Sequence, residues 1–462
     1  MKTLQTIFIK PLVVLCGFAL LFISCDEFIQ AGIPDSQLTT PAVFEDKGTA
    51  TAAMTSIYSK LRDYSILSGA PNGLSHSLGL YSDELTYYSS SASATDLYSN
   101  ALTSSDSELK VLWTTSYNQI YAANAILYGV ENSATLPSAD RDMLQGEALF
   151  VRALLHFYLT NLYGDVPYIS TTDYAINSKV SRIPVASVLS LVKKDLNDAI
   201  PLLKQEYLQP SRTRPNALTA HALLARVNLY MGLWAEAANE ASSVINHTEL
   251  YTLVGLDDTF KKNSPATIWQ LSPDKPTYNT NEGSTFIFET GPPPRSALSP
   301  TLLLSFEIND LRKIKWVKNV SNGVTTWSHP YKYKNTQMQG TPEEQSILFR
   351  IEEQYLIRAE ARARQGELTT AKEDLNIIRN RAGLGNTTAS SMETLVTAIL
   401  TERRHELFTE LGHRFFDLKR TGNLNSVLSS SKPGWDTTDS LFPLPNSELL
   451  LNANLQPQNP GY

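Results

Sequence analysis

Hydrophobic positions recur at helical spacing through most of this 462-residue chain. In residues 46–64, Ala53, Ile57 and Leu61 repeat every four positions, which is the period of one face of a helix. The stretch 109–130 carries a second stripe, whose side chains we expect in the core: Trp113, Tyr117, Ile120, Tyr121 and Ala125. Both patterns predict amphipathic helices.

Two further helices are predicted in the same half of the chain. Residues 146–163 are apolar nearly all round, which is typical of a buried helix. Gly164 supplies a C-cap there, and Pro167 prevents the helix from continuing. Residues 185–203 form an amphipathic pattern with inward positions at Val188, Leu191, Leu196 and Ile200.

Two predicted helical hairpins look alike. Residues 216–245 turn at Gly232, before a Leu-Trp-x-x-Ala spacing, and residues 352–383 turn at Gly366, before Glu-Leu-x-x-Ala. Small alanines where two helices cross, with a glycine between the helices, are typical of tetratricopeptide repeats. Residues 246–351 separate the two copies, so they are not a regular array, and generic antiparallel helix pairs are the alternative.

Two long stretches lack helical periodicity. Residues 65–107 are rich in Ser, Gly and Tyr, which predicts a loop with aromatic insertions. Residues 251–345 contain short β-rich pieces, IWQLS, TFIFET and KIKWVKNV, separated by turn signals such as Asn322-Gly323. The predicted fold class is therefore mainly α, with tetratricopeptide-like hairpins and an irregular, loop-rich half containing short β-strands.

Composition and charge narrow the function classes. Hydrophobic residues make up 42% and charged residues 18% of the chain, as in an ordinary globular protein. The formal net charge is −7. This dispersed acidic excess argues against nucleic acid as a partner, because proteins that bind nucleic acid usually carry a basic stripe.

The N-terminus has the pattern of a secretory signal. Lys2 and Lys10 precede the apolar run PLVVLCGFALLFIS, which ends at Cys25, and the residues before this cysteine resemble a bacterial lipobox. We expect removal of residues 1–24 and a covalent lipid on Cys25, with residues 25–45 as a tether; an ordinary secretory signal is the alternative. Acyl chains would anchor the protein to a membrane without spanning it.

The segment ERRHELFTELGHRFFDLKR, residues 402–420, opens like the zinc-protease pattern H-E-x-x-H. In that pattern the histidines are four positions apart, so that both project from one helix face to the metal. Here Thr409 takes the place of the second histidine, and His413 lies beyond it. We therefore predict that His405 and His413 are not metal ligands.

We predict instead that this segment is a charged structural joint packed against the second hairpin. Arg403 and Glu406 would pair across one helix turn, and Gly412 would end the helix. The apolar anchor of the joint would be Phe408, Phe415 and Phe416.

Other catalytic signatures are incomplete. The stretch GLSHS lacks the second glycine of a nucleophile elbow, and no phosphate loop is present. Three acid pairs could in principle serve glycoside hydrolysis: Asp83-Glu84, Asp257-Asp258 and Glu352-Glu353. Acids are common on surfaces, so these pairs alone make no case for catalysis, and we predict no catalytic residues.

Aromatic residues are the remaining functional candidates, with 21 Tyr, 16 Phe and 6 Trp. Flat rings stack on the apolar C–H faces of sugars, while polar neighbours bind hydroxyl groups. Aromatics on regular helix stripes, such as Trp113 and Tyr158, belong to the core, whereas those in polar loops have less reason to be buried. The candidate ligand-binding residues are Tyr81, Tyr87, Tyr88, Tyr98, Tyr278, Trp327 and Tyr331.

Several motifs, taken in order, resemble the SusD/RagB family of outer-membrane nutrient-binding lipoproteins. They are the lipobox, the helix EALFVRALLHFYLTNLYGDVPY, the two hairpins, ERRHELFTELGHRFFDLKRTG and the C-terminal QNPGY. The resemblance covers nearly all of the chain after Cys25. It implies an N-terminal helical region over 46–250 and a C-terminal region over 251–462 that holds the β-rich insert and the second hairpin.

The resemblance also implies a function. Proteins of this family are not enzymes; they sit on the outer face of the outer membrane, capture a glycan and deliver it to a SusC-like TonB-dependent transporter. A peptide ligand, a helical scaffold without ligand and a surface glycoside hydrolase are the alternatives. No cofactor is implied, a structural calcium stays open, and no motif transfers the family's ligand residues onto positions of this chain.

Overall fold

The computed structural model describes residues 40–462. The predicted signal segment 1–24, Cys25 and most of the predicted tether lie outside the described residues. Residues 1–43 and 44–462 are separate units, and the short helix α2, Thr40–Val43, belongs to the first. Within residues 40–462, no helix combines the length and the apolar character that a bilayer crossing requires.

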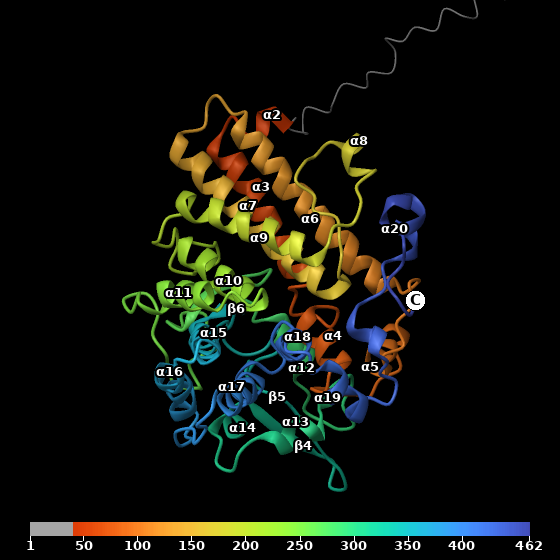
Figure 1. The fold of residues 1–462 in the computed structure, drawn as a ribbon, viewed down its shortest axis with the longest axis vertical. Coiled ribbons are helices and arrows are strands. Elements are labelled where there is room, and N and C mark those ends of the chain that lie inside the picture. The colour runs from red at the N-terminus through yellow and green to blue at the C-terminus, as the bar shows by residue number, and fades with distance from the viewer. Residues whose placement is uncertain (1–39) are drawn as a thin grey trace, which may run out of the picture. The chain divides into compact units, whose positions relative to one another are not determined.

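A continuous array of helices forms much of the unit 44–462 (Figure 1). Each helix of the array packs against the next, although the chain makes a long excursion between α11 and α15. The array consists of α3 (Lys47–Tyr64), α6 (Ser107–Glu131), α7 (Ser138–Tyr163), α9 (Val185–Ala199), α10 (Ala217–Tyr230), α11 (Trp234–Ile245), α15 (Ile351–Arg364), α16 (Leu368–Arg381) and α17 (Met392–Leu407). The prediction of a mainly α fold is confirmed.

The predicted stripes account for these helices. In α3 the Asp46 carboxylate caps the start by accepting hydrogen bonds from Gly48 N and Thr49 N, and Ile57 and Leu61 of the stripe are buried. The α7 stretch is buried on nearly every side, as its uniform apolar sequence predicts.

Both predicted hairpins are present, and they stack on each other. Gly232 and Gly366 turn the chain with φ angles of +71° and +83°, a region that glycine adopts without steric cost. Helix α11 of the first hairpin packs against α15 of the second. Small side chains line the contact, including the fully buried Ala241 and Ala361, so the two helices approach closely.

In the described residues 40–462, three two-stranded antiparallel sheets organise the irregular segments. Strand β2 (Thr267–Leu271) pairs with β6 (Ser346–Arg350), so the excursion between the hairpins leaves and returns through one small sheet. Strand β1 (Leu85–Tyr87) pairs with β3 (Ser296–Leu298). Strands β4 (Val317–Ser321) and β5 (Thr326–Pro330) form a hairpin around Asn322-Gly323. Of the predicted β-rich pieces, IWQLS is therefore confirmed.

Two local predictions are wrong, and a third is confirmed only in part. Residues 65–107 contain α4 (Leu74–Tyr81) and α5 (Ala92–Ser99), although their composition predicted a loop. TFIFET begins inside α12 (Asn281–Phe286), and KIKWVKNV is divided between α14 (Leu311–Lys315) and β4. Burial explains the first error, because every residue of α4 is buried and its conformation is set by tertiary contacts.

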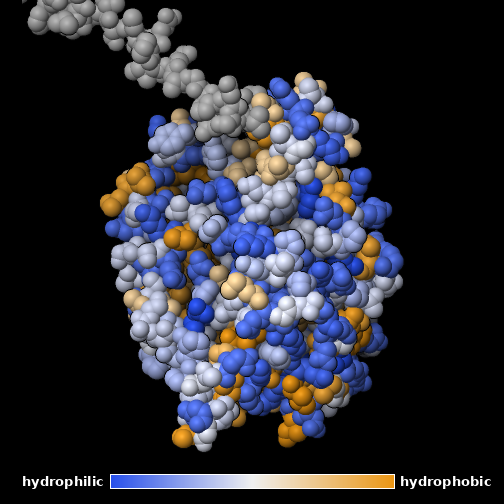
Figure 2. Space-filling view, turned by 180° about the vertical axis from the view of Figure 1, so that it is seen from behind, coloured by the Kyte–Doolittle hydropathy of each residue, from blue (hydrophilic) through white to orange (hydrophobic). Residues whose placement is uncertain are grey.

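Short elements complete the chain. They are α8 (Tyr174–Asn177), η3 (Ile200–Leu202), α13 (Pro300–Ser305), α18 (His413–Arg420), α19 (Leu424–Ser431), η4 (Thr437–Ser440), α20 (Asn446–Leu451) and η5 (Ala453–Leu455). Figure 2 shows one face of the molecule with hydrophilic side chains over most of it and hydrophobic ones in small separate patches.

The charged joint at 402–420 packs against the second hairpin as predicted, but two of its details differ. Helix α17 ends at Leu407, and Gly412 is the left-handed residue before α18, so it precedes the next helix and does not end the first. The guanidinium of Arg403 bonds Asp417 at 2.7 Å and does not pair with Glu406. Phe408, Phe415 and Phe416 are buried and form the predicted anchor.

A buried ion-pair network surrounds Glu406. Its carboxylate lies 2.5 Å from the guanidinium of Arg350 and 3.2 Å from that of Arg312, and it also contacts Arg381. These arginines come from the end of β6, from α14 and from the end of α16. The network therefore connects the β-rich insert to the second hairpin and to α17.

Candidate functional site

Two of the predicted ligand-binding residues, the exposed Tyr88 and the half-buried Trp327, form a pair of aromatic rings. Their ring centroids are 6.5 Å apart and the rings are perpendicular. Tyr88 is 44% exposed. The pKa of Tyr88 is raised by partial burial and by the nearby hydroxyl of Tyr98, so a third predicted residue lies close. We call Tyr88, Tyr98 and Trp327 the aromatic platform.

Backbone pairing positions the two rings. Tyr88 directly follows β1, and its N–H donates a hydrogen bond to the carbonyl of Arg295, which extends the pairing of β1 with β3. Trp327 stands on β5, opposite Val320 in the β4–β5 register, and β5 packs beside β3. The platform therefore rests on hydrogen-bonded strands, which hold side chains more firmly than free loops do.

Trp327 is supported from beneath by a small hydrophobic cluster and by a glycine. Its ring packs against Phe288, Ala297 and Val320. A Cβ atom added to Gly291 would lie 2.1 Å from the ring, so the indole rests directly on the backbone of this glycine. Phe288 and Gly291 were not predicted, because their role depends on a contact across the insert.

Replacing Gly291 with alanine is expected to displace Trp327 and to lower the free energy of unfolding by about 1–3 kcal/mol, as for other overpacked sites. Urea unfolding measures the change. Gly385→Ala is the matched control, because the space around Gly385 is open, and it should leave stability nearly unchanged. Equal stability of the two variants would contradict the close contact.

Tyr98 is partly covered by a buried lysine. The Lys432 ammonium lies 4.0 Å from the centroid of the Tyr98 ring and donates a hydrogen bond to the Leu80 carbonyl at 2.6 Å. Burial lowers the pKa of Lys432 to about 7. One face of Tyr98 is thus occupied by the Lys432 ammonium.

Two more candidates lie on the same strands. Tyr87 is the last residue of β1 and is half-buried. Tyr331 follows β5, with the ammonium groups of Lys318 and Lys334 at 5.1 and 4.2 Å from its ring centroid. Its ring is thus engaged by two cations, whereas Tyr88 is exposed.

Two candidates lie elsewhere. Tyr278 belongs to a pocket of about 310 Å³ with Asp274, Lys275 and Gln345, and its hydroxyl accepts a hydrogen bond from Lys275. Tyr81 was predicted as a loop residue and is instead fully buried at the end of α4, where its ring packs edge-on against Phe442. The prediction for Tyr81 is therefore corrected: it is a core residue of the structure.

The three acid pairs are engaged in ionic contacts or buried. Asp83 accepts hydrogen bonds from Arg404 and Arg414, and Glu353 binds Arg226 at 2.6 Å. Asp257 and Asp258 pair with surface lysines, and Glu352 pairs with Arg381. Burial, and then the charge of Asp83, raise the pKa of Glu84 to about 7, but Glu84 is only 1% exposed and is closed to a substrate.

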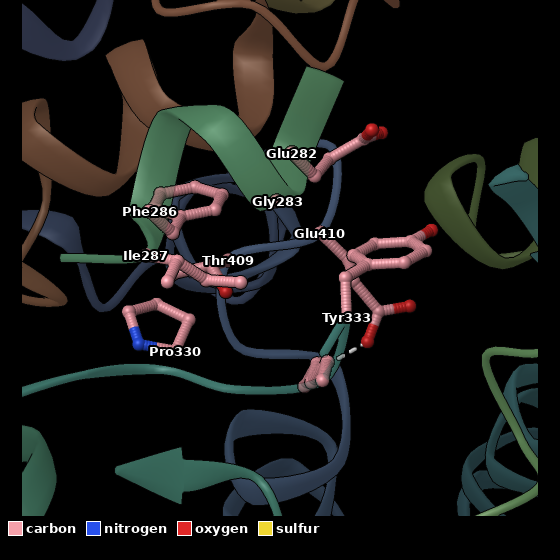
Figure 3. Close-up of a pocket in the computed structure, with 9 residues that line it drawn as sticks. Glu282, Gly283, Phe286, Ile287, Pro330, Tyr333, Thr409 and Glu410 are labelled. Atoms are coloured by element: carbon pink, nitrogen blue, oxygen red, sulfur yellow. Dashed lines mark hydrogen bonds and ion pairs between the residues drawn. The ribbon is translucent and has the colours of Figure 1, made fainter. Parts of the chain in front are cut away.

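A small internal cavity lies between the insert and the joint, lined by Phe286, Ile287, Pro330, Thr409 and Glu410 among others (Figure 3). Its volume is about 20 Å³, which is room for about one water molecule. The Glu410 carboxylate contacts the buried Lys332 ammonium there. The cavity is too small for an organic ligand.

The histidines of the joint have other contacts. His405 Nε2 lies 3.0 Å from the Ser305 hydroxyl, and its ring stacks on Phe306. His413 Nδ1 lies 3.9 Å from the Glu353 carboxylate. In the part of the chain that the structure describes, no cluster of three His, Cys, Asp or Glu residues could hold a metal ion.

Known protein families match two long parts of the chain. Residues 45–229 match a family model described as starch-binding associating with outer membrane, and residues 315–462 match the model of the SusD family. The chain therefore belongs to the SusD/RagB family, whose members are binding proteins rather than enzymes.

Individual relatives are distant in sequence. SusD-like protein P2 of Formosa agariphila is 26% identical over 417 residues, which cover 77% of this chain and 81% of that protein. SusD-like protein P25 of the same organism is 23% identical, with coverage of 94% and 95%.

Solved structures share the fold. A SusD superfamily protein from Bacteroides vulgatus has a TM-score of 0.79 and 22% identity, covering 90% of this chain and 99% of its own. A laminarin-binding SusD-like protein has a TM-score of 0.74 and 23% identity, with the same coverage. The fold predicted from the family resemblance is thus confirmed.

Proposed function

We propose that this chain is a lipid-anchored protein on the cell surface that captures a glycan and delivers it to a TonB-dependent outer-membrane transporter. The family supplies the class of ligand and the association with the outer membrane. The observation that carries the proposal for this chain is the pairing of the exposed Tyr88 with the half-buried Trp327 on paired strands. Cys25 would carry the lipid.

Capture by the platform would be non-covalent. The indole of Trp327 presents a flat apolar surface to the C–H face of a sugar ring, and Tyr88 forms a second wall at a right angle to it. The strands and Gly291 hold Trp327 in place before the ligand arrives, so little conformational entropy is lost on binding.

The alternatives fit the site less well. A glycoside hydrolase needs two accessible carboxyl groups, yet Asp83 and Glu353 are buried in arginine pairs. A scaffold without ligand gives no reason for an exposed tyrosine beside a half-buried tryptophan on β-strands outside the helical array. A peptide ligand would also use aromatic surfaces, so a binding experiment is needed to distinguish a peptide from a glycan.

Trp327→Ala is expected to weaken binding of soluble laminarin or starch by at least tenfold, or about 1.4 kcal/mol, because buried aromatic anchors dominate binding energies. Affinity electrophoresis of the purified full chain measures retardation by each polysaccharide. Tyr88→Ala should weaken binding as well, whereas the control Tyr64→Ala, at an exposed position on α3, should not.

Other results would redirect the proposal. Binding of a peptide mixture that Trp327→Ala abolishes, with no polysaccharide binding, would replace the glycan with a peptide. If the transporter binds the chain while every polysaccharide and peptide fails to bind, the scaffold alternative is correct.

A further inference from the structure

A groove lies on the helical array, apart from the aromatic platform. It has a volume of about 390 Å³, within the range of small-molecule sites, and lies between α6, the segment around α8 and the C-terminal tail at α20 (Figure 1). Three tyrosines line it, from α6 and α8: Tyr117, Tyr121 and Tyr174. In Figure 1 α6, α8 and α20, which line the groove, lie above β4 and β5, so the groove is separate from the strand that carries Trp327.

Side-chain hydrogen bonds hold the walls of the groove together. The amides of Asn452 and Asn454 in the tail donate to the carbonyls of Val180 and Lys179, at 2.8 and 2.7 Å. Arg182 donates to the Asn459 side chain at 2.6 Å. Because the tail and the α8 segment are linked in this way, the groove is preformed.

The tyrosines of the groove present open ring surface. Tyr121 is 52% and Tyr174 is 82% exposed. Tyr117 is fixed by Trp113, whose ring centroid is 4.8 Å away, and by a hydrogen bond from its hydroxyl to the Pro167 carbonyl at 2.9 Å. The prediction that the whole α6 stripe faces the core is thus wrong for Tyr121, which lies at the edge of the stripe.

Two buried polar atoms of lining residues have no hydrogen-bond partner in the protein. They are Oγ1 of Thr114 and Oδ1 of Asn177.

The charge of the lining selects among ligand classes. Glu448 is its single charged side chain, and no lysine or arginine lines the groove. An anionic ligand such as a phosphate, a sulfated sugar or a uronate would therefore meet one negative charge and no cation. Aromatic rings beside polar groups match a neutral sugar, whose C–H faces stack while its hydroxyls donate to the Glu448 carboxylate.

We propose that this groove is a second binding site for neutral carbohydrate, independent of the aromatic platform. The inference rests on the proposed function only for the class of ligand. Two sites on one chain would hold a long glycan at two points, which raises the overall affinity through the high effective concentration of the second contact.

The test compares variants of the purified full chain by calorimetric titration with laminarihexaose and, separately, with maltoheptaose. The native chain is expected to bind two molecules of at least one of these oligosaccharides. The double variant Tyr121→Ala/Tyr174→Ala should bind one molecule, with the remaining affinity changed less than twofold. Tyr128→Ala is the matched control, because Tyr128 is a 60%-exposed tyrosine of α6 outside the groove lining, and it should still bind two.

Trp327→Ala separates this inference from the proposed function. The Trp327→Ala variant should also bind one oligosaccharide molecule, and that molecule should lie in the groove. If the double tyrosine variant binds like Tyr128→Ala, the groove inference fails and the platform stands. If Trp327→Ala changes nothing and the double variant abolishes binding, the platform fails and the groove stands. If neither oligosaccharide binds the native chain, or if the double variant loses only a bound peptide, the groove is not a carbohydrate site.

Discussion

Replacing Glu406 with glutamine is expected to lower the free energy of unfolding by about 3–5 kcal/mol, the usual cost of breaking a buried ion pair. Glu406 is fully buried, and its carboxylate is shared by Arg312, Arg350 and Arg381. Burial alone would raise its pKa, but the three guanidinium groups hold the pKa of Glu406 well below its ordinary range. Glutamine keeps the shape and removes the charge, leaving buried arginines without a full complement of anions.

Chemical denaturation at neutral pH measures this loss. Glu367→Gln is the matched control, since Glu367 is 55% exposed and lies 4.0 Å from Arg362 in a surface pair. Such a pair contributes about 0–1 kcal/mol, so the control should remain close to the native chain. If the two glutamine variants are equally stable, the network around Glu406 does not hold the insert, the hairpin and α17 together.

The sequence predicts those parts of the fold whose determinants are local. The helices of the array have stripes that repeat within a few residues, and the hairpins turn at Gly232 and Gly366, so both are evident from short windows. The stacking of α11 on α15 is not evident, because residues 246–350 separate the two helices in the chain. The partners of Glu406 are hidden for the same reason: Arg312 and Arg350 lie far away in sequence.

Tyr81 shows how composition can mislead. It adjoins a serine-rich stretch, which favours a loop, but α4 lies in the core and Tyr81 packs against Phe415 and Phe442 from the distant C-terminal segments. Short polar sequences adopt buried helices where tertiary contacts outweigh local propensity. Serine hydroxyls there are satisfied locally, as Ser77 and Ser82 donate to carbonyls four residues earlier.

The candidate site was predictable residue by residue but not as an arrangement. Tyr88 and Trp327 stand out as aromatics in polar stretches, and Asn322-Gly323 predicts the hairpin that carries Trp327. Their meeting depends on the pairing of β1 with β3, and residues 88–295 separate these two strands in the chain. Such a pairing of two three-residue strands has no local signal, and neither does the support of Trp327 by Gly291.

Acid is expected to destabilise the protein steeply below about pH 5, with Glu353 as a principal cause. Glu353 is buried; desolvation raises its pKa, but the opposing charge of Arg226 and of the nearby His413 and Arg403 prevails and lowers the pKa to about 2. In the unfolded chain a glutamate titrates at an ordinary value, so the stabilisation is complete above that value. It is lost as the pH falls from about 4.5 through 2, by about 3 kcal/mol for this residue alone.

His413 adds to the loss of stability, in a pH range slightly above that of Glu353. Burial lowers the pKa of His413 to about 4, so the unfolded chain binds this proton first as the pH falls below about 6.5. Arg226 and Arg403 oppose the proton on His413, whereas Glu353 and Asp417 favour it. Both residues therefore make the unfolded state take up more protons than the native state, and the native state is weakened from pH 6.5 downward.

Denaturant unfolding of the native chain and of Glu353→Gln between pH 7 and pH 2.5 isolates the contribution of Glu353 to the acid sensitivity. The glutamine variant should be much less stable at pH 7, because it leaves Arg226 buried without its anion. The gap should narrow as the pH falls, since protonation removes the same charge from the native chain. The control Glu367→Gln should differ little from the native chain in free energy of unfolding at every pH. A gap for Glu353→Gln that stays constant from pH 7 to pH 2.5 would mean that the Arg226–Glu353 pair is not the source of acid sensitivity.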